Sequence, residues 1–152
     1  YQSPPFVTSE ALVERFEAAA PDSLKGFVGD LFRKITLYDN RATGATYRET
    51  ADGRYRVTLT VEARKQQADS IGASPTEAPM DLPVEIGVFA EESDVGAEDQ
   101  RTLYRQTHRL TSGTQEITVT VDEKPARAGV DPFTLLIDRE TEDNMTTVTR
   151  AD

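Results

Sequence analysis

The spacing of apolar residues changes from a helical period to strict alternation near residue 35, and this change constrains the fold more than any other feature. Before it, Leu24, Phe27, Val28 and Leu31 recur every three or four residues, as on one face of a helix. After it, apolar residues occupy every second position from 55 to 63, as in a strand with one buried face. The sequence therefore predicts a short helical segment followed by a mainly β region.

Two short amphipathic helices are expected at the start of the chain. Thr8 or Ser9 can cap the first helix, and Pro21 ends it. Asp22 or Ser23 can cap the second helix, which is weakened by two glycines, Gly26 and Gly29. These glycines alternatively leave room for another element to approach.

About seven strands are predicted after the helices, at residues 35–38, 45–50, 55–64, 84–88, 101–110, 115–121 and 133–137. Asp39-Asn40 is interpreted as a turn, and Ala51-Asp52-Gly53 as a hairpin turn. The residues at 146–148 have weak strand character. No helix lies between the predicted strands, so parallel crossovers are disfavoured. We expect an antiparallel, immunoglobulin-like β-sandwich at residues 35–152, with residues 1–34 as a helical lead-in from a preceding region.

The net negative charge of the chain lies entirely in its second half. Residues 1–76 carry ten basic and ten acidic side chains, whereas residues 77–152 carry seven and 17, which gives the net charge of −10. An acidic chain of this kind is not expected to bind nucleic acid or an anionic membrane surface. The acid-rich stretch at 77–99 is interpreted as an exposed edge and loop, or alternatively as a patch that meets a basic partner.

The sequence carries few signs of catalytic chemistry. It has no cysteine, one histidine (His108) and no tryptophan, and it lacks nucleotide-binding, zinc-protease and nucleophile-elbow motifs. We expect His108 to be an exposed strand residue. The acids at 138–144 offer oxygen ligands to calcium but lack the spacing of an EF-hand, so they are interpreted as a turn. We predict no catalytic, cofactor-binding or metal-binding residue in this chain.

Several segments together resemble one known family. They lie at residues 30–42, 53–57, 62–69, 85–89, 124–133, 136–139 and 143–144. In order and spacing they are similar to the C-terminal region of large bacterial membrane proteins. These proteins join an ABC-transporter-permease-like membrane part to a zinc aminopeptidase-like (gluzincin) part. The resemblance covers nearly the whole chain.

The resemblance implies a non-catalytic accessory domain. The family's His-Glu-x-x-His motif and its further glutamate ligand belong to an upstream segment, so any zinc belongs to that part of the parent. The domain would lie on the extracytoplasmic (periplasmic) face of a bacterial inner membrane. It would pack on the upstream peptidase-like and membrane regions of the same chain. The chain starts at Tyr1 rather than Met and has no signal-peptide pattern, so we expect a piece of a longer protein.

One group of polar residues near the C-terminus is a candidate site. Lys124-Pro125 and Gly129-Val130-Asp131-Pro132 are expected to bracket a loop, where glycine supplies backbone freedom and proline stiffens the exit. We expect a hydrogen-bonded cluster at one end of the sandwich, which either fixes the loops there or docks on the upstream peptidase-like domain. Its members are Asp131, Asp138, Arg139, Asp143 and Asn144.

Three functions remain open from the sequence. The first is the accessory domain described above, with its charge-balanced helical end as the contact with its neighbours. The second is a stand-alone extracytoplasmic sandwich that binds a polysaccharide or protein ligand. The third is a hydrolase that uses a pair of carboxylates.

Overall fold

The computed structural model describes residues 6–69, 71–72, 74–91 and 101–151. The acid-rich stretch at 92–99 therefore lies outside the described residues. Within them the chain divides into two compact units. A helical unit comprises Tyr1–Thr36 and Gln67–Thr76, and a β unit comprises Leu37–Gln66 and Glu77–Asp152.

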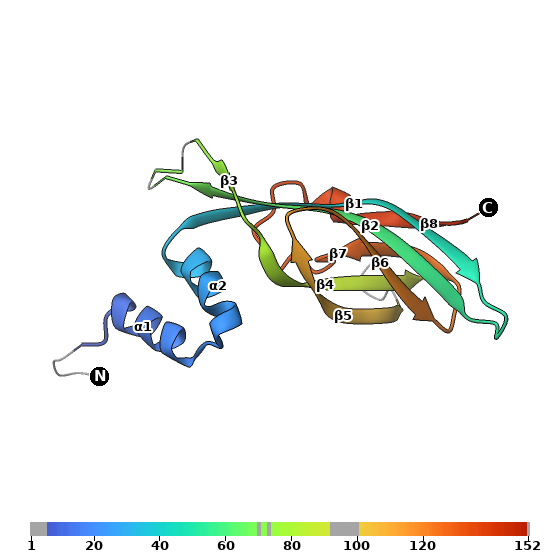
Figure 1. Cartoon of the computed structure of the whole chain (residues 1–152), viewed down its shortest axis with the longest axis horizontal. Coiled ribbons are helices and arrows are strands. Elements are labelled where there is room, and N and C mark those ends of the chain that lie inside the picture. The colour runs from blue at the N-terminus through green and yellow to red at the C-terminus, as the bar shows by residue number, and fades with distance from the viewer. Residues whose placement is uncertain (1–5, 70, 73, 92–100, 152) are drawn as a thin grey trace. The chain divides into compact units, whose positions relative to one another are not determined.

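The chain is mainly β, with two short helices ahead of the strands, as expected (Figure 1). The helices are α1 (Ser9–Ala19) and α2 (Asp22–Phe32), with a 3₁₀ turn, η2, at Thr141–Asn144. The strands are β1 (Ile35–Glu49), β2 (Tyr55–Ala68), β3 (Thr76–Ala78), β4 (Asp81–Ala90), β5 (Thr102–Thr111), β6 (Gly113–Val121), β7 (Pro125–Val130) and β8 (Met145–Arg150).

Each helix has an identifiable start. The Thr8 hydroxyl accepts a hydrogen bond of 3.2 Å from the backbone N–H of Ala11 and so caps α1, as predicted. The cap position of α2 is Pro21, which makes no side-chain cap bond, so the prediction of Asp22 or Ser23 was wrong. A Cβ at Gly26 or Gly29 would meet nothing within 4 Å, so neither glycine makes room for a described element.

The strands form one curled sheet in the order β3-β2-β1-β8-β7-β4-β5, with β6 paired to β2. The last strand corrects the expected antiparallel arrangement, because β8 pairs with β1 in parallel, with Ala45 opposite Val148. About a hundred residues separate these two strands, which is ample chain for a parallel return without an intervening helix. The immunoglobulin-like sandwich stays a prediction.

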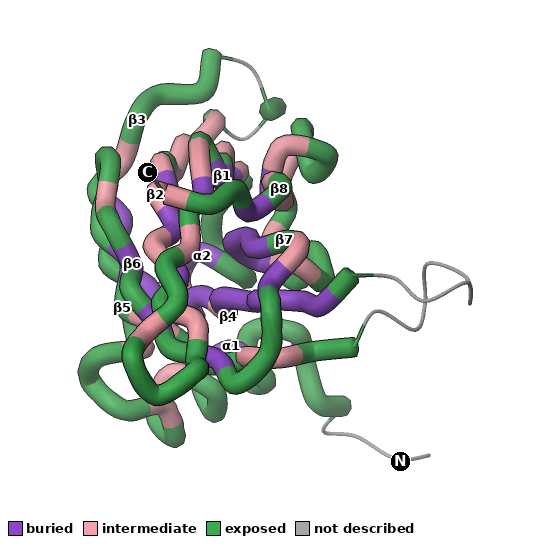
Figure 2. The backbone as a smooth tube through the Cα atoms, turned by 90° about the vertical axis from the view of Figure 1, so that its right-hand side faces the viewer, coloured by how far each residue is buried: buried purple, intermediate pink, exposed green. Residues whose placement is uncertain are grey.

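The core of the β unit follows the alternation read from the sequence. On β2, Val57, Leu59, Val61 and Ala63 are fully buried, and on β6 Ile117, Val119 and Val121 are buried as well. On β4 every residue from Ile86 to Ala90 is buried, which makes this strand a central one (Figure 2).

Three local predictions were wrong. Asp39-Asn40 is not a turn, since β1 runs through it as one strand of 15 residues with Asn40 fully buried. The segment at 125–130, interpreted as a loop, is strand β7 between β4 and β8. The segment at 133–137, predicted to be a strand, is part of the loop that follows β7.

Candidate docking site

The loop between β7 and β8, residues 131–144, is ordered by a buried carboxylate. Asp131 is 1% exposed, and its two oxygens accept hydrogen bonds of 2.9 Å each from the backbone N–H groups of Leu135 and Leu136. Its own backbone accepts a third bond from the N–H of Thr134. Asp131 (φ 43°) and Thr134 (φ 51°) both lie in the left-handed region, so the chain turns sharply rather than extending as a strand.

The base of this loop packs on one face of the sheet. The Phe133 ring lies edge-on to Phe89 with centroids 6.3 Å apart, and the Arg105 guanidinium lies 4.3 Å from the centre of the Phe133 ring. Arg105 also donates a 2.9 Å bond to Glu85. Sequence reasoning missed Arg105, because a cation on an exposed strand face gives no local signal of its aromatic partner.

Two paired glycines make room for the loop. Gly87 on β4 lies opposite Gly129 on β7, and directly opposite residues point to the same face. A Cβ at Gly87 would lie 2.6 Å from the Phe89 ring and 3.0 Å from Pro132. A Cβ at Gly129 would overlap the backbone oxygen of Asn144 and the Met145 sulfur. Gly129 is therefore required for space, and the predicted role in backbone freedom was wrong, since no positive φ occurs there.

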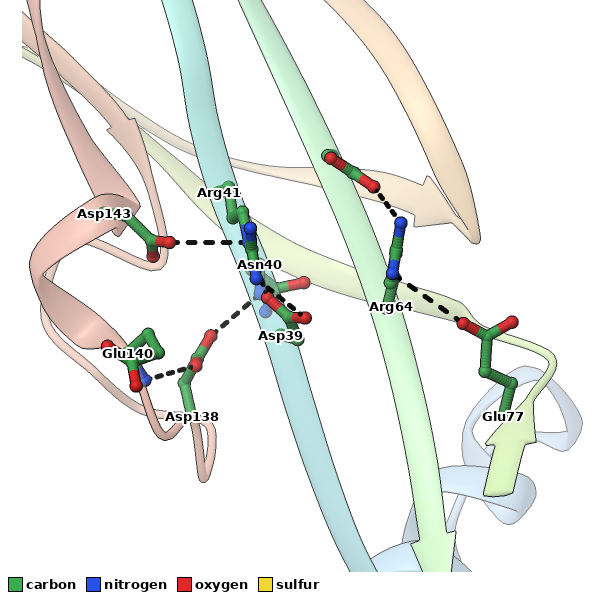
Figure 3. Close-up of polar contacts among 9 residues, drawn as sticks. Asp39, Asn40, Arg41, Arg64, Glu77, Asp138, Glu140 and Asp143 are labelled. Atoms are coloured by element: carbon green, nitrogen blue, oxygen red, sulfur yellow. Dashed lines mark hydrogen bonds and ion pairs between the residues drawn. The ribbon is translucent and has the colours of Figure 1, made fainter. Parts of the chain in front are cut away.

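Asp138 joins the loop to strand β1. One of its carboxylate oxygens accepts a 2.8 Å bond from the backbone N–H of Asn40, and the other accepts a 3.0 Å bond from the N–H of Glu140 (Figure 3). The backbone N–H of Tyr38 also donates to the carbonyl of Ile137 at 2.9 Å. These bonds hold residues 137–140 along β1 without a continuous ladder.

Asp143 belongs to a charged group around Arg41. The Arg41 guanidinium pairs with Asp39 at 2.8 Å and with Asp143 at 3.4 Å (Figure 3). Burial raises the pKa of Asp143, the Arg41 charge lowers it, and the carboxylates of Asp138, Asp39 and Glu140 raise it further. The net direction is upward, because one Asp143 oxygen is buried without a hydrogen-bond donor among the described residues.

Replacement of Asp143 by Asn is expected to stabilise the fold at pH 7. A carboxyl whose pKa is raised on folding destabilises the native state when it is charged, and this penalty disappears as the pH falls through its folded-state pKa. The stability gain of Asp143→Asn should therefore shrink as the pH falls from 7 to 4, as measured by urea unfolding. A stability gain that is the same at pH 7 and pH 4 would contradict a raised pKa of Asp143.

Asp81 provides a control of opposite sign. Its hydrogen bond to Arg109 lowers its pKa, so Asp81→Asn should destabilise the fold at pH 7 and lose this effect at low pH.

The remaining two candidate residues behave differently. Asn144 is buried, and its side-chain amide has no partner among the described residues; the fully buried Asn40 shares this property. Arg139 is exposed. In the part of the chain that the structure describes, the side chains of Asp131 and Asp138 accept bonds from backbone N–H groups, and Asp143 pairs with Arg41 of β1. Within that part, no hydrogen bond or ion pair joins the five candidate residues to one another, so the expected bonding within the cluster was wrong. Their role in docking stays a prediction.

The loop displays two large apolar side chains. Leu135 is 69% exposed and Ile137 is 67% exposed, although the backbone on either side of them is hydrogen-bonded. Acidic residues follow directly at Asp138, Glu140 and Glu142. The outer part of the loop is thus apolar with an acidic border.

The helical unit displays a larger apolar face. Leu12, Phe16, Leu31, Phe32 and Ile35 are each between 41% and 53% exposed. The Phe16 and Phe32 rings stack with centroids 5.4 Å apart and an angle of 9°. Three of these residues line an open hollow of about 390 Å³, whose full lining is Leu31, Phe32, Arg33, Lys34, Ile35, Ala68 and Asp69.

A charged contact fixes α1 against α2. Arg33 donates to Glu17 at 2.6 Å and to Glu10 at 2.9 Å, so one guanidinium bridges two acids of α1. These bonds raise the pKa of Arg33 and lower that of Glu17. Together with the aromatic stack, this contact holds the two helices side by side while their apolar face stays exposed.

A second hollow, of about 290 Å³, lies in the β unit near Arg64. Its charges are balanced, because Arg64 pairs with Glu62 at 2.5 Å. Arg64 also lies 3.9 Å from Glu77 (Figure 3). Its lining of Glu62, Arg64, Lys65, Glu77, Ala78, Ser112 and Gly113 offers no concentrated charge to a ligand.

Among the described residues, no group of three or more His, Asp or Glu side chains is arranged to hold a metal ion. His108 lies on β5, with its Nε2 2.6 Å from the Tyr104 hydroxyl. Burial raises the pKa of that tyrosine. Within the described ranges, no helix has the length and apolar character to span a membrane.

Comparison of the chain with protein-family models, with curated proteins and with solved structures found no match.

Proposed function

We propose that this chain is a non-catalytic accessory domain of a membrane-anchored protein with a zinc aminopeptidase-like part and an ABC-transporter-permease-like part. It docks on the upstream peptidase-like region through the apolar face of α1 and α2. In this proposal the domain is extracytoplasmic, holds no cofactor, and leaves any zinc chemistry to the upstream part. The sequence resemblance supports the class of parent protein.

The observation that carries the proposal is the exposed apolar face of the helical unit. The helices contain 11 residues each, and isolated helices of this length are marginal in water. Val13 is the buried residue of α1, and Val28 is the buried apolar residue of α2. Five large apolar side chains stay exposed beside them. A contiguous apolar face of this kind marks an interaction surface rather than ordinary solvent-exposed surface.

The double substitution Leu31→Ser/Phe32→Ser tests this proposal. Both side chains line the hollow and are about half exposed, so their loss removes contact area. Because Phe32→Ser also removes the ring stack on Phe16, circular dichroism of the variant must show that its helix content is that of the wild type. We expect the affinity for the upstream region, produced separately from the same open reading frame, to fall at least about tenfold in calorimetric titration.

Ile71→Ser is the matched control, because Ile71 is 83% exposed in the same unit but lies outside the helices and the hollow. Its affinity should equal that of the wild type. If Leu31→Ser/Phe32→Ser binds as tightly as the control, or if the open reading frame encodes no upstream region, the proposal is wrong.

A further inference from the structure

We propose that the loop at 131–144 is a second docking site, whose partner surface is a protein pocket that is apolar at its centre and bordered by Arg or Lys. The inference rests on the proposed function, because we assign this partner surface to the same upstream region. The residues involved all belong to the β unit.

The loop is ordered before any partner binds. The Asp131 carboxylate fixes the backbone at Leu135 and Leu136, and the backbone of Ile137 accepts a bond from Tyr38 on β1. Phe133 is held by Phe89 and Arg105 at the base. Binding by a loop that is already ordered loses little conformational entropy, which favours affinity.

The exposed side chains of the loop define the centre of the contact. Leu135 and Ile137 are about two-thirds exposed and stand two positions apart on a fixed backbone. These two side chains are not part of the core, whose buried apolar residues lie on strands such as β2, β4 and β6. Two neighbouring apolar anchors of this size fit a pocket on a partner, as at the centre of protein interfaces.

The charges beside the anchors define the border of the partner pocket. Glu140 and Glu142 are exposed and make no ion pair among the described residues, whereas Arg41 is already held by Asp39 and Asp143. Arg139 is the one basic residue at positions 131–144. A complementary surface therefore carries Arg or Lys around an apolar centre, and its association weakens as salt screens these charges.

A membrane fits this loop less well than a protein. Exposed apolar loops that enter bilayers gain from basic neighbours, because the lipid surface is anionic. Here the neighbours are acidic, so the same surface would be repelled.

Titration of the upstream region with the whole 152-residue chain and its variants tests the inference. We expect Leu135→Ser/Ile137→Ser to weaken binding at least tenfold while unfolding like the wild type. Glu140→Gln/Glu142→Gln should weaken binding at 50 mM salt and flatten its salt dependence up to 500 mM. Ile71→Ser again serves as the control.

The outcomes separate this inference from the proposed function. If both loop variants bind like the wild type while Leu31→Ser/Phe32→Ser does not, the inference is overturned and the proposed function stands. If the helical variant also binds normally, the proposed function fails as well. Binding of the wild type to phosphatidylcholine vesicles that is lost in Leu135→Ser/Ile137→Ser would show a lipid contact and overturn the inference.

Discussion

Replacement of Gly129 by Ala is expected to lower the free energy of unfolding by about 3 kcal/mol, the upper end of the usual cost of overpacking a core. The new methyl group would overlap the backbone oxygen of Asn144 and would lie 3.1 Å from the Cα of Met145. Because these are backbone atoms of the neighbouring strand β8 and the loop before it, no side-chain rotation relieves the overlap. Urea unfolding followed by circular dichroism measures the loss.

Gly44→Ala provides the matched control for this substitution. Gly44 also lies in a strand, but a Cβ there would meet nothing within 4 Å. Gly44→Ala should change the free energy of unfolding by no more than about 1 kcal/mol. We expect the change to be a gain, because alanine reduces the number of conformations open to the unfolded chain. Equal stabilities for the two variants would mean that β7 and β8 do not approach as closely as described.

Replacement of Asp131 by Ala is expected to cost at least about 4 kcal/mol, the sum of two hydrogen bonds to a charged group and a backbone penalty. The substitution removes a carboxylate that accepts two backbone hydrogen bonds, and bonds to charged groups contribute about 1.5–3 kcal/mol. It also places alanine at a left-handed φ of 43°, which costs about 1 kcal/mol more than for Asp or Asn. The amides of Leu135 and Leu136 should then exchange with solvent much faster than in the wild type.

Two further variants separate these contributions. Asp131→Asn keeps a residue that tolerates this φ and one acceptor oxygen, so its loss should be smaller than that of Asp131→Ala. Asp131→Gly removes the backbone strain at this positive φ but supplies no side-chain acceptor. The amides of Leu135 and Leu136 should therefore still exchange fast in this variant. If Asp131→Ala unfolds like the wild type, the carboxylate does not order the loop.

The strands that sequence reasoning located correctly are those with local signals. β2 alternates cleanly, and the turn before it contains Gly53 at a positive φ of 79°, as a tight hairpin requires. The corner between β5 and β6 likewise has Gly113 at a φ of 105°. In these places the local pattern and the tertiary structure agree.

The two errors near the C-terminus have different physical causes. Phe133, Leu135 and Ile137 alternate as in a strand, but Asp131 takes the N–H groups of Leu135 and Leu136 that a strand would offer to its neighbour. Strand β7 was interpreted as a loop because its Ala and Gly residues have low strand propensity. These small residues are needed between two close neighbours, which only the tertiary structure shows.

The candidate site was also only partly predictable. The sequence indicated that Asp131, Asp138 and Asp143 fix the loop region, because such residues commonly bond to nearby backbone. It gave no sign of Arg41 as the partner of Asp143, since about a hundred residues separate them. The amphipathic pattern of the helices was likewise visible, but a pattern cannot tell whether the apolar face is covered within the chain.

Amide hydrogen exchange tests the docking account most directly. The measurement compares α1 and α2 in the isolated chain and in the full-length parent protein. We expect fast exchange in both helices of the isolated chain, because their apolar face is uncovered. In the parent we expect slow exchange, because the upstream region covers this face. Exchange rates in the two helices that are the same in the isolated chain and in the parent would contradict it.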